Sequence, residues 1–169
     1  MSCDGASCSP ADTPALFVPD FAWPANAIQK VAFVCLHGSA KSLIAAAYFN
    51  RLARQHGLDF AATTSGPEPD AEVPPNVIEG LRNHAIDVGG YRPTMIGAAG
   101  LADADLIVSF ACDAGTRLAP DKPVERWDEC PAVSDDFETA WRFITARVER
   151  LFRRLAQETA VAKCWEQGQ

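Results

Sequence analysis

The sequence predicts an α/β fold, a three-layer sandwich in which a four-stranded parallel sheet carries helices on both faces. The first observation is that short apolar runs alternate with amphipathic stretches, which is typical of a parallel sheet covered on both sides. The second is a polar loop, residues 35–42, between an apolar run and an amphipathic stretch. Open α/β sheets bind ligands at the carboxyl ends of their strands, so this loop is also a candidate site.

The first half of the predicted domain holds two strands and two helices. Residues 31–34 form a continuous apolar run that predicts a buried strand. Residues 43–56 follow as a helix with one apolar face, and Gly57 is its stop signal. Residues 60–64 predict a short strand. Residues 74–75 are both proline and open a second helix, where an early proline is tolerated.

The second half predicts two more strands and a long helix. A short helix is expected at residues 94–99, followed by a buried strand at 105–110 and a last, short strand at 124–127. Ser134 is the expected N-cap of the final helix. Apolar residues then recur every three to four positions as far as Leu155, which is the helical period.

The length of 169 residues suits one domain. We expect that domain at residues 29–157, with an N-terminal tail at 1–28 that is partly disordered and a C-terminal tail at 158–169. The sequence motifs described below lie within the bounds of this domain. Composition is ordinary for a globular protein, at 48% hydrophobic and 22% charged residues.

Charge and cysteine spacing exclude several classes of partner. The net charge is −7 and no basic stripe occurs, so we expect no nucleic-acid partner. No apolar run reaches membrane-spanning length, and no basic, apolar leader opens the chain, so we expect a cytoplasmic protein without a membrane partner. The six cysteines do not have the spacing of a zinc site. We therefore expect no metal and no cofactor.

The loop combines a nucleophile with an anion cradle. Cys35 ends the first strand, and the loop runs into a helix N-terminus. Backbone N–H groups in such a loop can converge on one point, which binds an anion and favours a thiolate. We expect Cys35 to be the catalytic nucleophile. The expected oxyanion-binding residues are Leu36, His37, Gly38, Ser39, Ala40, Lys41 and Ser42.

Four motifs occur in order over residues 30–155. They are residues 35–42; Thr64-Ser65-Gly66 with Val73-Pro74-Pro75-Asn76-Val77 and His84-Ala85-Ile86-Asp87; Ala104-Asp105-Leu106-Ile107-Val108; and Ser134-Asp135-Asp136-Phe137-Glu138-Thr139 after Pro131. Together they resemble the low-molecular-weight protein tyrosine phosphatase family, which includes the thioredoxin-coupled arsenate reductases. The resemblance implies the same α/β fold, a phosphate-binding loop and a cysteine nucleophile at Cys35. It also implies a catalytic role for Lys41.

The loop departs from the family pattern at three positions. Lys41 replaces the family's Arg, whose planar guanidinium grips an oxyanion with two parallel hydrogen bonds. Gly38 replaces an Asn, and we expect a left-handed backbone there, which glycine adopts freely. His37 replaces a Gly. We expect its ring to point to solvent, with donation to the anion as the alternative.

The family's general acid is also replaced. Its phosphatases place an Asp before a Pro in the last loop, whereas Cys130 precedes Pro131 here. A thiol is a poor substitute for a carboxylic acid in protonating a leaving alkoxide. Asp128 is the candidate that could reach the site from the same loop and serve as the catalytic acid. The alternative is that it is a solvated loop acid.

Two cysteines are candidates for redox chemistry, Cys112 and Cys130. The arsenate reductases carry a resolving Cys just after the third strand and a second one further on. Cys112 lies one position from the first, and Leu118 occupies the second. We therefore favour Cys112 as a buried side chain or loop thiol over a resolving thiol.

Three functions follow from the resemblance. The first is weak hydrolysis of a phosphomonoester of the phosphotyrosine type through a cysteinyl-phosphate intermediate. The second is arsenate reduction using Cys35 and a second cysteine. The third is a catalytically impaired pseudophosphatase. The expected ligands are phosphate, sulfate or an arsenate-like oxyanion, and a phosphorylated protein is a further candidate partner.

Overall fold

A computed structural model describes residues 29–167, and the N-terminal tail expected at residues 1–28 lies outside them. The four strands form one parallel sheet in the order β2-β1-β3-β4. Their bounds are β1 Lys30–Cys35, β2 Ala61–Ser65, β3 Leu106–Phe110 and β4 Val124–Arg126. The predicted sheet is therefore confirmed.

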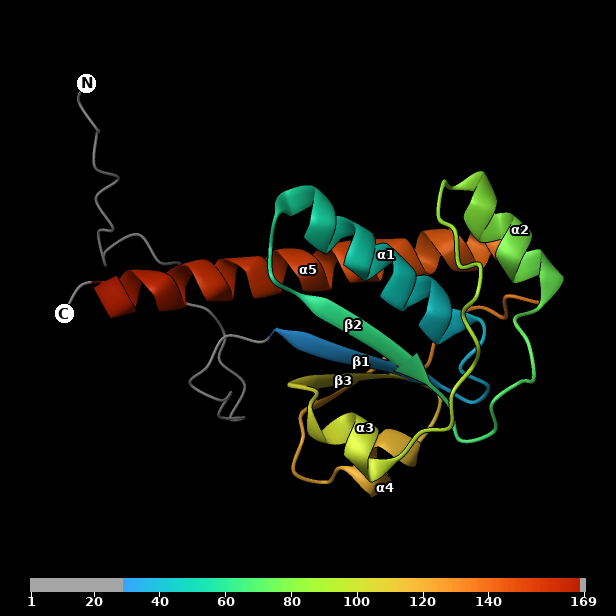
Figure 1. Cartoon of the computed structure of the whole chain (residues 1–169), viewed down its shortest axis with the longest axis horizontal. Coiled ribbons are helices and arrows are strands. Elements are labelled where there is room, and N and C mark those ends of the chain that lie inside the picture. The colour runs from blue at the N-terminus through green and yellow to red at the C-terminus, as the bar shows by residue number, and fades with distance from the viewer. Residues whose placement is uncertain (1–28, 168–169) are drawn as a thin grey trace.

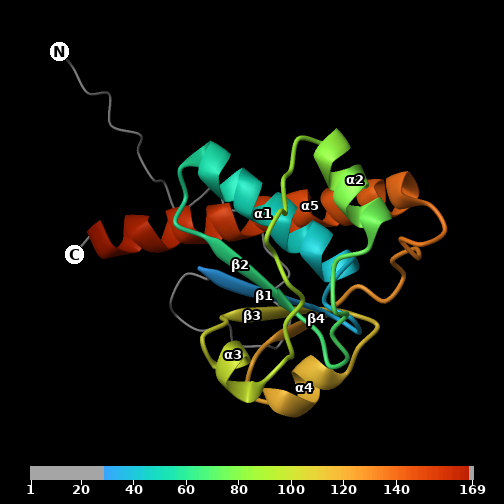
Figure 2. The same cartoon turned by 45° about the vertical axis from the view of Figure 1, so that its right-hand side comes forward.

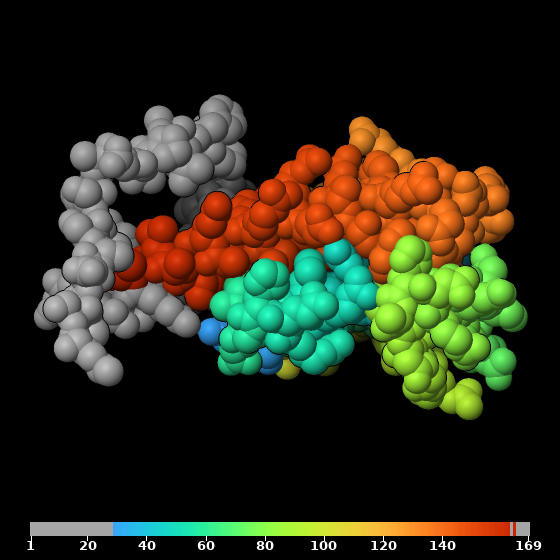
Figure 3. Space-filling view, turned by 90° about the horizontal axis from the view of Figure 1, so that it is seen from above, coloured from blue at the N-terminus to red at the C-terminus, as the bar shows by residue number. Residues whose placement is uncertain are grey.

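Helices cover both faces of the sheet and complete the three layers (Figure 1). One face carries α1 Lys41–His56, α2 Pro75–Asn83 and α5 Phe137–Gln167. The other carries the short helices α3 Ala98–Ala102 and α4 Ala114–Leu118, which Figure 2 shows below β3 and β4. Seen from above, α1 and α2 lie along α5 (Figure 3). No helix within residues 29–167 combines the length and apolarity needed to cross a bilayer.

Strand periodicity divides the core into two parts. Val31, Phe33 and Cys35 face the larger core, beneath α1 and α5, while Ala32 and Val34 face the smaller one, beside α3 and α4. Alternate residues of a strand point to opposite faces, so one apolar run supplies both cores. This explains why the run in β1 is apolar without a break.

The strand order places the loop that follows β1 at a switch point. From β1 the chain passes to β2 on one side, and then crosses to β3 on the other. Cys35 and Phe110 are paired at the carboxyl ends of β1 and β3. The loops that leave these two strands separate, which opens the crevice that open α/β sheets use for ligands. Residues 36–42, which leave β1 at this point, are called the β1 loop below.

One short helix differs from its expected position, and a second was not expected at all. The helix expected at residues 94–99 begins only at Ala98. The residues before it are extended, because the Gly66 N–H donates to the Thr94 carbonyl (3.1 Å) and the Ile96 N–H to the Gly66 carbonyl (2.9 Å). Because these backbone groups pair with Gly66, they do not form the hydrogen bonds of a helix, and the helix starts later. The short helix α4 is an element that sequence reasoning missed.

The final helix also differs from expectation at both ends. Asp136, not Ser134, caps it: its Oδ1 accepts the N–H groups of Glu138 (3.0 Å) and Thr139 (3.3 Å). The Thr139 hydroxyl also donates to Asp136, and this contact is the main reason that the Asp136 pKa is lowered. The Ser134 hydroxyl donates to the side chain that follows it instead. At the other end the helix continues through residues 158–167, which we expected to form part of a tail.

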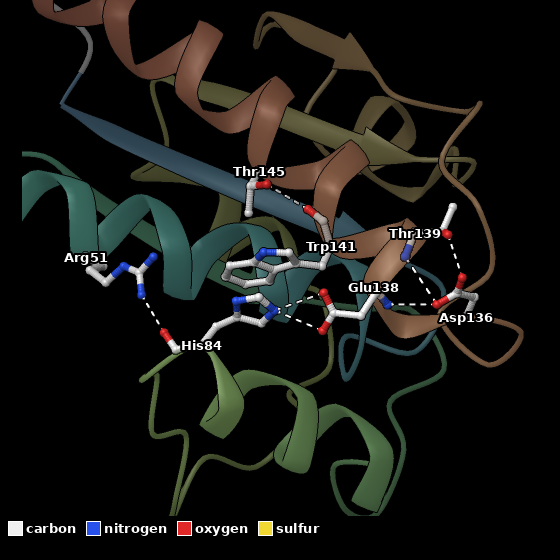
Figure 4. Close-up of polar contacts among 7 residues, drawn as sticks. All are labelled: Arg51, His84, Asp136, Glu138, Thr139, Trp141 and Thr145. Atoms are coloured by element: carbon white, nitrogen blue, oxygen red, sulfur yellow. Dashed lines mark hydrogen bonds and ion pairs between the residues drawn. The ribbon is translucent and has the colours of Figure 1, made fainter.

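The end of α2 is fixed to α5 by a stacked histidine (Figure 4). The His84 ring lies on the Trp141 ring with centroids 4.0 Å apart and an interplanar angle of 15°. Its Nε2 donates to Glu138 Oε1 at 3.0 Å, and Arg51 of α1 donates to its carbonyl at 2.7 Å. Tyr48 packs edge-on against Trp141. Three helices thus meet at Trp141, and α2 carries one wall of the pocket described below.

We expect Trp141→Ala to lower the free energy of unfolding by about 3 kcal/mol or more, because removing a buried indole leaves a cavity at this junction. Urea unfolding followed by circular dichroism measures the change. Arg150→Ala, an exposed change on the same helix, is the control and should stay within about 0.5 kcal/mol of the parent protein. Equal urea midpoints of unfolding for the two variants would show that the stacking of His84 on Trp141 does not hold α2 in place.

Candidate active site

A pocket with a cavity volume of about 430 Å³ lies at the carboxyl ends of β1 and β3. Its floor and one side come from the β1 loop, and the remaining walls come from three other connections and the first turn of α2. The lining residues are Cys35, Leu36, His37, Ser39, Ala40, Lys41, Asp70, Pro74, Asn76, Val77, Phe110, Ala111, Ala132, Val133 and Ser134. Five of the seven predicted oxyanion-binding residues line it, and the other two, Gly38 and Ser42, contact the Cys35 sulfur.

Cys35 lies at the buried base of this pocket, only 6% exposed. Its Sγ accepts the Gly38 N–H at 3.2 Å and lies 3.0 Å from Ser42 Oγ. Thr64 donates its hydroxyl to Ser42 Oγ at 2.7 Å, which leaves the Ser42 proton to point at the sulfur. Two donors aimed at one sulfur suit a thiolate, which accepts hydrogen bonds and is the nucleophilic form.

The loop keeps its shape through two glycines in close contact. Gly38 has φ +63°, which confirms the left-handed backbone expected there. A Cβ at Gly38 would lie 2.9 Å from the Gly66 nitrogen. A Cβ at Gly66 would lie 2.6 Å from the carbonyl oxygens of Cys35 and Leu36. Only bare backbone fits at both places, so the connection after β2 presses directly on the loop.

A second segment, residues 68–70, is clamped onto the same loop. The Glu68 N–H donates to the Leu36 carbonyl (3.0 Å) and the Asp70 N–H to the His37 carbonyl (3.3 Å). His37 Nδ1 donates to the Glu68 carbonyl at 2.9 Å. The histidine therefore does not simply point to solvent as expected, although its side chain is 50% exposed.

Asp70 is the pocket residue that sequence reasoning missed. Its carboxylate lines the cavity, accepts the hydroxyl proton of Ser39 and lies 3.6 Å from His37 Nδ1. Nothing in the Pro-rich stretch around it marks it out, because its partners are about thirty positions away in the sequence. The only available signal was its place shortly after Thr64-Ser65-Gly66.

Lys41 lines the pocket but already has a partner. Its Nζ donates to the carbonyl oxygen of Cys130 at 2.7 Å. This contact ties the β1 loop to the connection between β4 and α5, which supplies Ala132, Val133 and Ser134 to the pocket wall. The ammonium is a single positive charge at the site, with two further N–H donors.

Asp128, the expected acid, is not among the residues that line the cavity, although it contacts Ala111, which is. Its Oδ1 accepts the Ala111 N–H at 3.0 Å, and its Oδ2 accepts Arg126 Nε at 2.8 Å. The Arg126 contact lowers the Asp128 pKa, which favours the form without a proton to donate. Ala111 has φ +50°, a strained value for a residue with a side chain. Asp128 therefore holds the turn after β3.

The two redox candidates lie outside the pocket lining. Cys130 is buried in the same larger core as Cys35, and burial raises the pKa of its thiol to about 11, which favours the protonated form over the nucleophilic thiolate. Cys112 packs in the smaller core beside α3 and α4, whereas Cys35 belongs to the larger one. This agrees with Cys112 as a buried side chain. Cys164 lies exposed on α5.

The charged and nucleophilic groups that line the cavity are few, namely Cys35, His37, Lys41 and Asp70. This set suits attack by sulfur on a tetrahedral oxyanion, with one cation and one carboxyl group beside it. Within residues 29–167, His, Cys, Asp and Glu side chains do not form any group of three or more that could hold a metal ion.

Comparison with solved structures shows which known proteins share this fold. YfkJ from Bacillus subtilis matches with a TM-score of 0.68 and 21% identity, over 79% of this chain and 98% of that one. Vibrio vulnificus Wzb in complex with benzylphosphonate matches with a TM-score of 0.65 and 16% identity, over 75% of this chain and 99% of that one. An arsenate reductase from Archaeoglobus fulgidus matches with a TM-score of 0.58 and 29% identity, over 74% of this chain and 97% of that one.

No curated protein matches the sequence. The model of one protein family does, that of the low molecular weight phosphotyrosine protein phosphatases, over residues 30–129. This span covers more than half of the chain, and it includes all four strands, the loop with Cys35 and the glycines that shape it. The chain therefore belongs to the low-molecular-weight phosphotyrosine protein phosphatase family.

Proposed function

We propose that this protein hydrolyses phosphomonoesters through a cysteinyl-phosphate intermediate on Cys35. The observation that supports this most is the sulfur at the base of the pocket, with Gly38 N–H and Ser42 Oγ directed at it. Family membership supports a phosphate-like oxyanion as the ligand class, as do solved relatives bound to benzylphosphonate, phosphate or sulfate. Substrates of the phosphotyrosine type, on a phosphorylated protein, are the finer proposal. The cytoplasm, where thiols stay reduced, is the proposed location.

In this reaction the thiolate attacks phosphorus, and the bond to the leaving oxygen breaks. Backbone N–H groups of residues 36–42 hold the phosphoryl oxygens, and Lys41 neutralises part of their charge. Water then attacks phosphorus and releases phosphate and the thiolate. We expect slow turnover, because the ammonium of Lys41 offers one point contact and already serves the Cys130 carbonyl.

The test is turnover of an aryl phosphate by the full chain, with Cys35→Ser as the inactive control. Phosphate release that Cys35→Ser abolishes supports the proposal. Phosphate binding measured by calorimetry, without turnover, would contradict it and indicate a pseudophosphatase. Arsenite formation from arsenate with a thioredoxin system would instead indicate a reductase, for which Cys130 would have to act despite its buried, protonated thiol.

We expect Ser42→Ala to slow the alkylation of Cys35 by roughly tenfold at neutral pH, because a hydrogen bond to a charged group contributes about 1.5–3 kcal/mol. Thr64→Val should give a smaller decrease, since it removes only the donor that orients Ser42. Mass spectrometry of the Cys35 peptide after iodoacetamide treatment measures both. Thr145→Ala, on α5, is the control. An unchanged rate in Ser42→Ala would contradict the role assigned to its hydroxyl.

We expect Lys41→Arg to raise kcat for an aryl phosphate by roughly tenfold or more, through a bidentate grip on the transition-state oxygens. Lys30→Arg makes the same exchange at an exposed position and is the matched control. Steady-state kinetics on the parent protein and the two variants measures the effect. A Lys41→Arg protein that binds phosphate but turns over no faster would show that the lysine is not what limits the rate.

A further inference from the structure

We propose that Asp70 is the acid–base residue of this pocket. The inference rests on the proposed function, since it assigns a role in that same reaction. Asp70 protonates the leaving oxygen in the first step and takes a proton from the attacking water in the second. The residue comes from the connection between β2 and α2, on a different side of the cavity from the connection between β4 and α5, where the family's acid is found.

The position of Asp70 fits the geometry of displacement at phosphorus. Cys35 is at the buried base of the pocket, 6% exposed, whereas the Asp70 side chain is 38% exposed at its rim. In an in-line displacement the leaving oxygen lies opposite the attacking sulfur. A substrate attacked from the base therefore has its leaving oxygen toward the opening, where the Asp70 carboxyl group lies.

One carboxylate oxygen is fixed and the other remains available. The Ser39 hydroxyl donates to Asp70 Oδ2, and the Asp70 N–H is fixed by the His37 carbonyl. Asp70 Oδ1 lies 3.6 Å from His37 Nδ1, beyond hydrogen-bond distance, because that nitrogen donates to the Glu68 carbonyl. Across the described part of the chain no hydrogen bond to Oδ1 is found, so this oxygen can meet a substrate.

The proposed reaction needs a proton on the Asp70 carboxyl group, within the set of groups that line the cavity. Besides Asp70, the titratable groups lining the cavity are Cys35, His37 and Lys41. In the proposed reaction a phosphate dianion binds between these groups, and the Asp70 carboxyl group beside it carries the proton. As the S–P bond forms and the P–O bond breaks, that proton passes to the leaving oxygen. Water then attacks phosphorus, its proton returns to Asp70, and the S–P bond breaks.

The other two candidates for the acid are poorly suited. Cys130 occupies the position before Pro131, but its thiol is directed at the Pro131 carbonyl and is not part of the cavity wall. Asp128 is engaged by Ala111 and Arg126. Of the pocket-lining residues, Asp70 alone bears a carboxyl group.

The test compares two substrates that differ in how much they need an acid. Phenyl phosphate has a poor leaving group, and 2,4-dinitrophenyl phosphate a good one. We expect Asp70→Asn to lose roughly 10²–10⁴-fold in kcat/KM with the first and little with the second. With the second, slow hydrolysis of the intermediate should produce a burst of dinitrophenolate equal to the enzyme concentration. Glu72→Gln, which removes an exposed charge two residues away, should match the parent protein.

The outcomes separate this inference from the proposed function. If the parent protein shows no Cys35-dependent release of dinitrophenolate, the proposed function fails and Asp70 fails with it. If the parent is active and Asp70→Asn loses equally little with both substrates, or if Asp128→Asn shows the leaving-group dependence instead, only the role of Asp70 is overturned. Asp70→Glu should recover part of the activity with phenyl phosphate. Phosphate binding by Asp70→Asn verifies that its pocket is intact.

Discussion

The β1 loop and the connection after β2 meet through bare backbone, and the site depends on this contact. Gly66 leaves no room for a side chain between itself and the carbonyls of Cys35 and Leu36. Because the two segments touch so closely, residues 68–70 can add four further hydrogen bonds to the loop, two through backbone N–H groups and two through the side chains of His37 and Ser39. The loop is thus held open by its neighbour, with the Cys35 sulfur facing the space inside.

Electrostatics at the pocket differ from what an arginine loop would give. A thiolate at Cys35 and a carboxylate at Asp70 face one ammonium, that of Lys41. Side chains alone therefore provide little net attraction for a dianion, and backbone N–H groups must supply much of it. In the proposed role, Asp70 enters the reaction carrying a proton and therefore adds no negative charge beside a bound dianion.

The sheet and the nucleophile could be predicted because their signals are local. An unbroken apolar run means a strand buried on both faces, and Cys35 followed by a glycine-bearing loop and a helix is contiguous in sequence. Asp70 could not be predicted, since it reaches the pocket through contacts with residues about thirty positions away. Ser134 and Asp136 are both good caps, and only the path of the chain decides between them. Likewise, the ion pair that holds Asp128 outside the pocket depends on geometry that spacing does not reveal.

The length of α5 has a consequence for how the molecule presents its pocket. At 1.5 Å per residue, the 31 residues of this helix extend about 46 Å, more than twice the length of any strand in the sheet. Its first turns lie beside the pocket wall, and its last turns extend past the opposite end of the sheet (Figure 1). Anything attached at the far end of α5 would therefore leave the pocket facing outward. The helix thus places its own last turns at the opposite end of the sheet from the candidate active site.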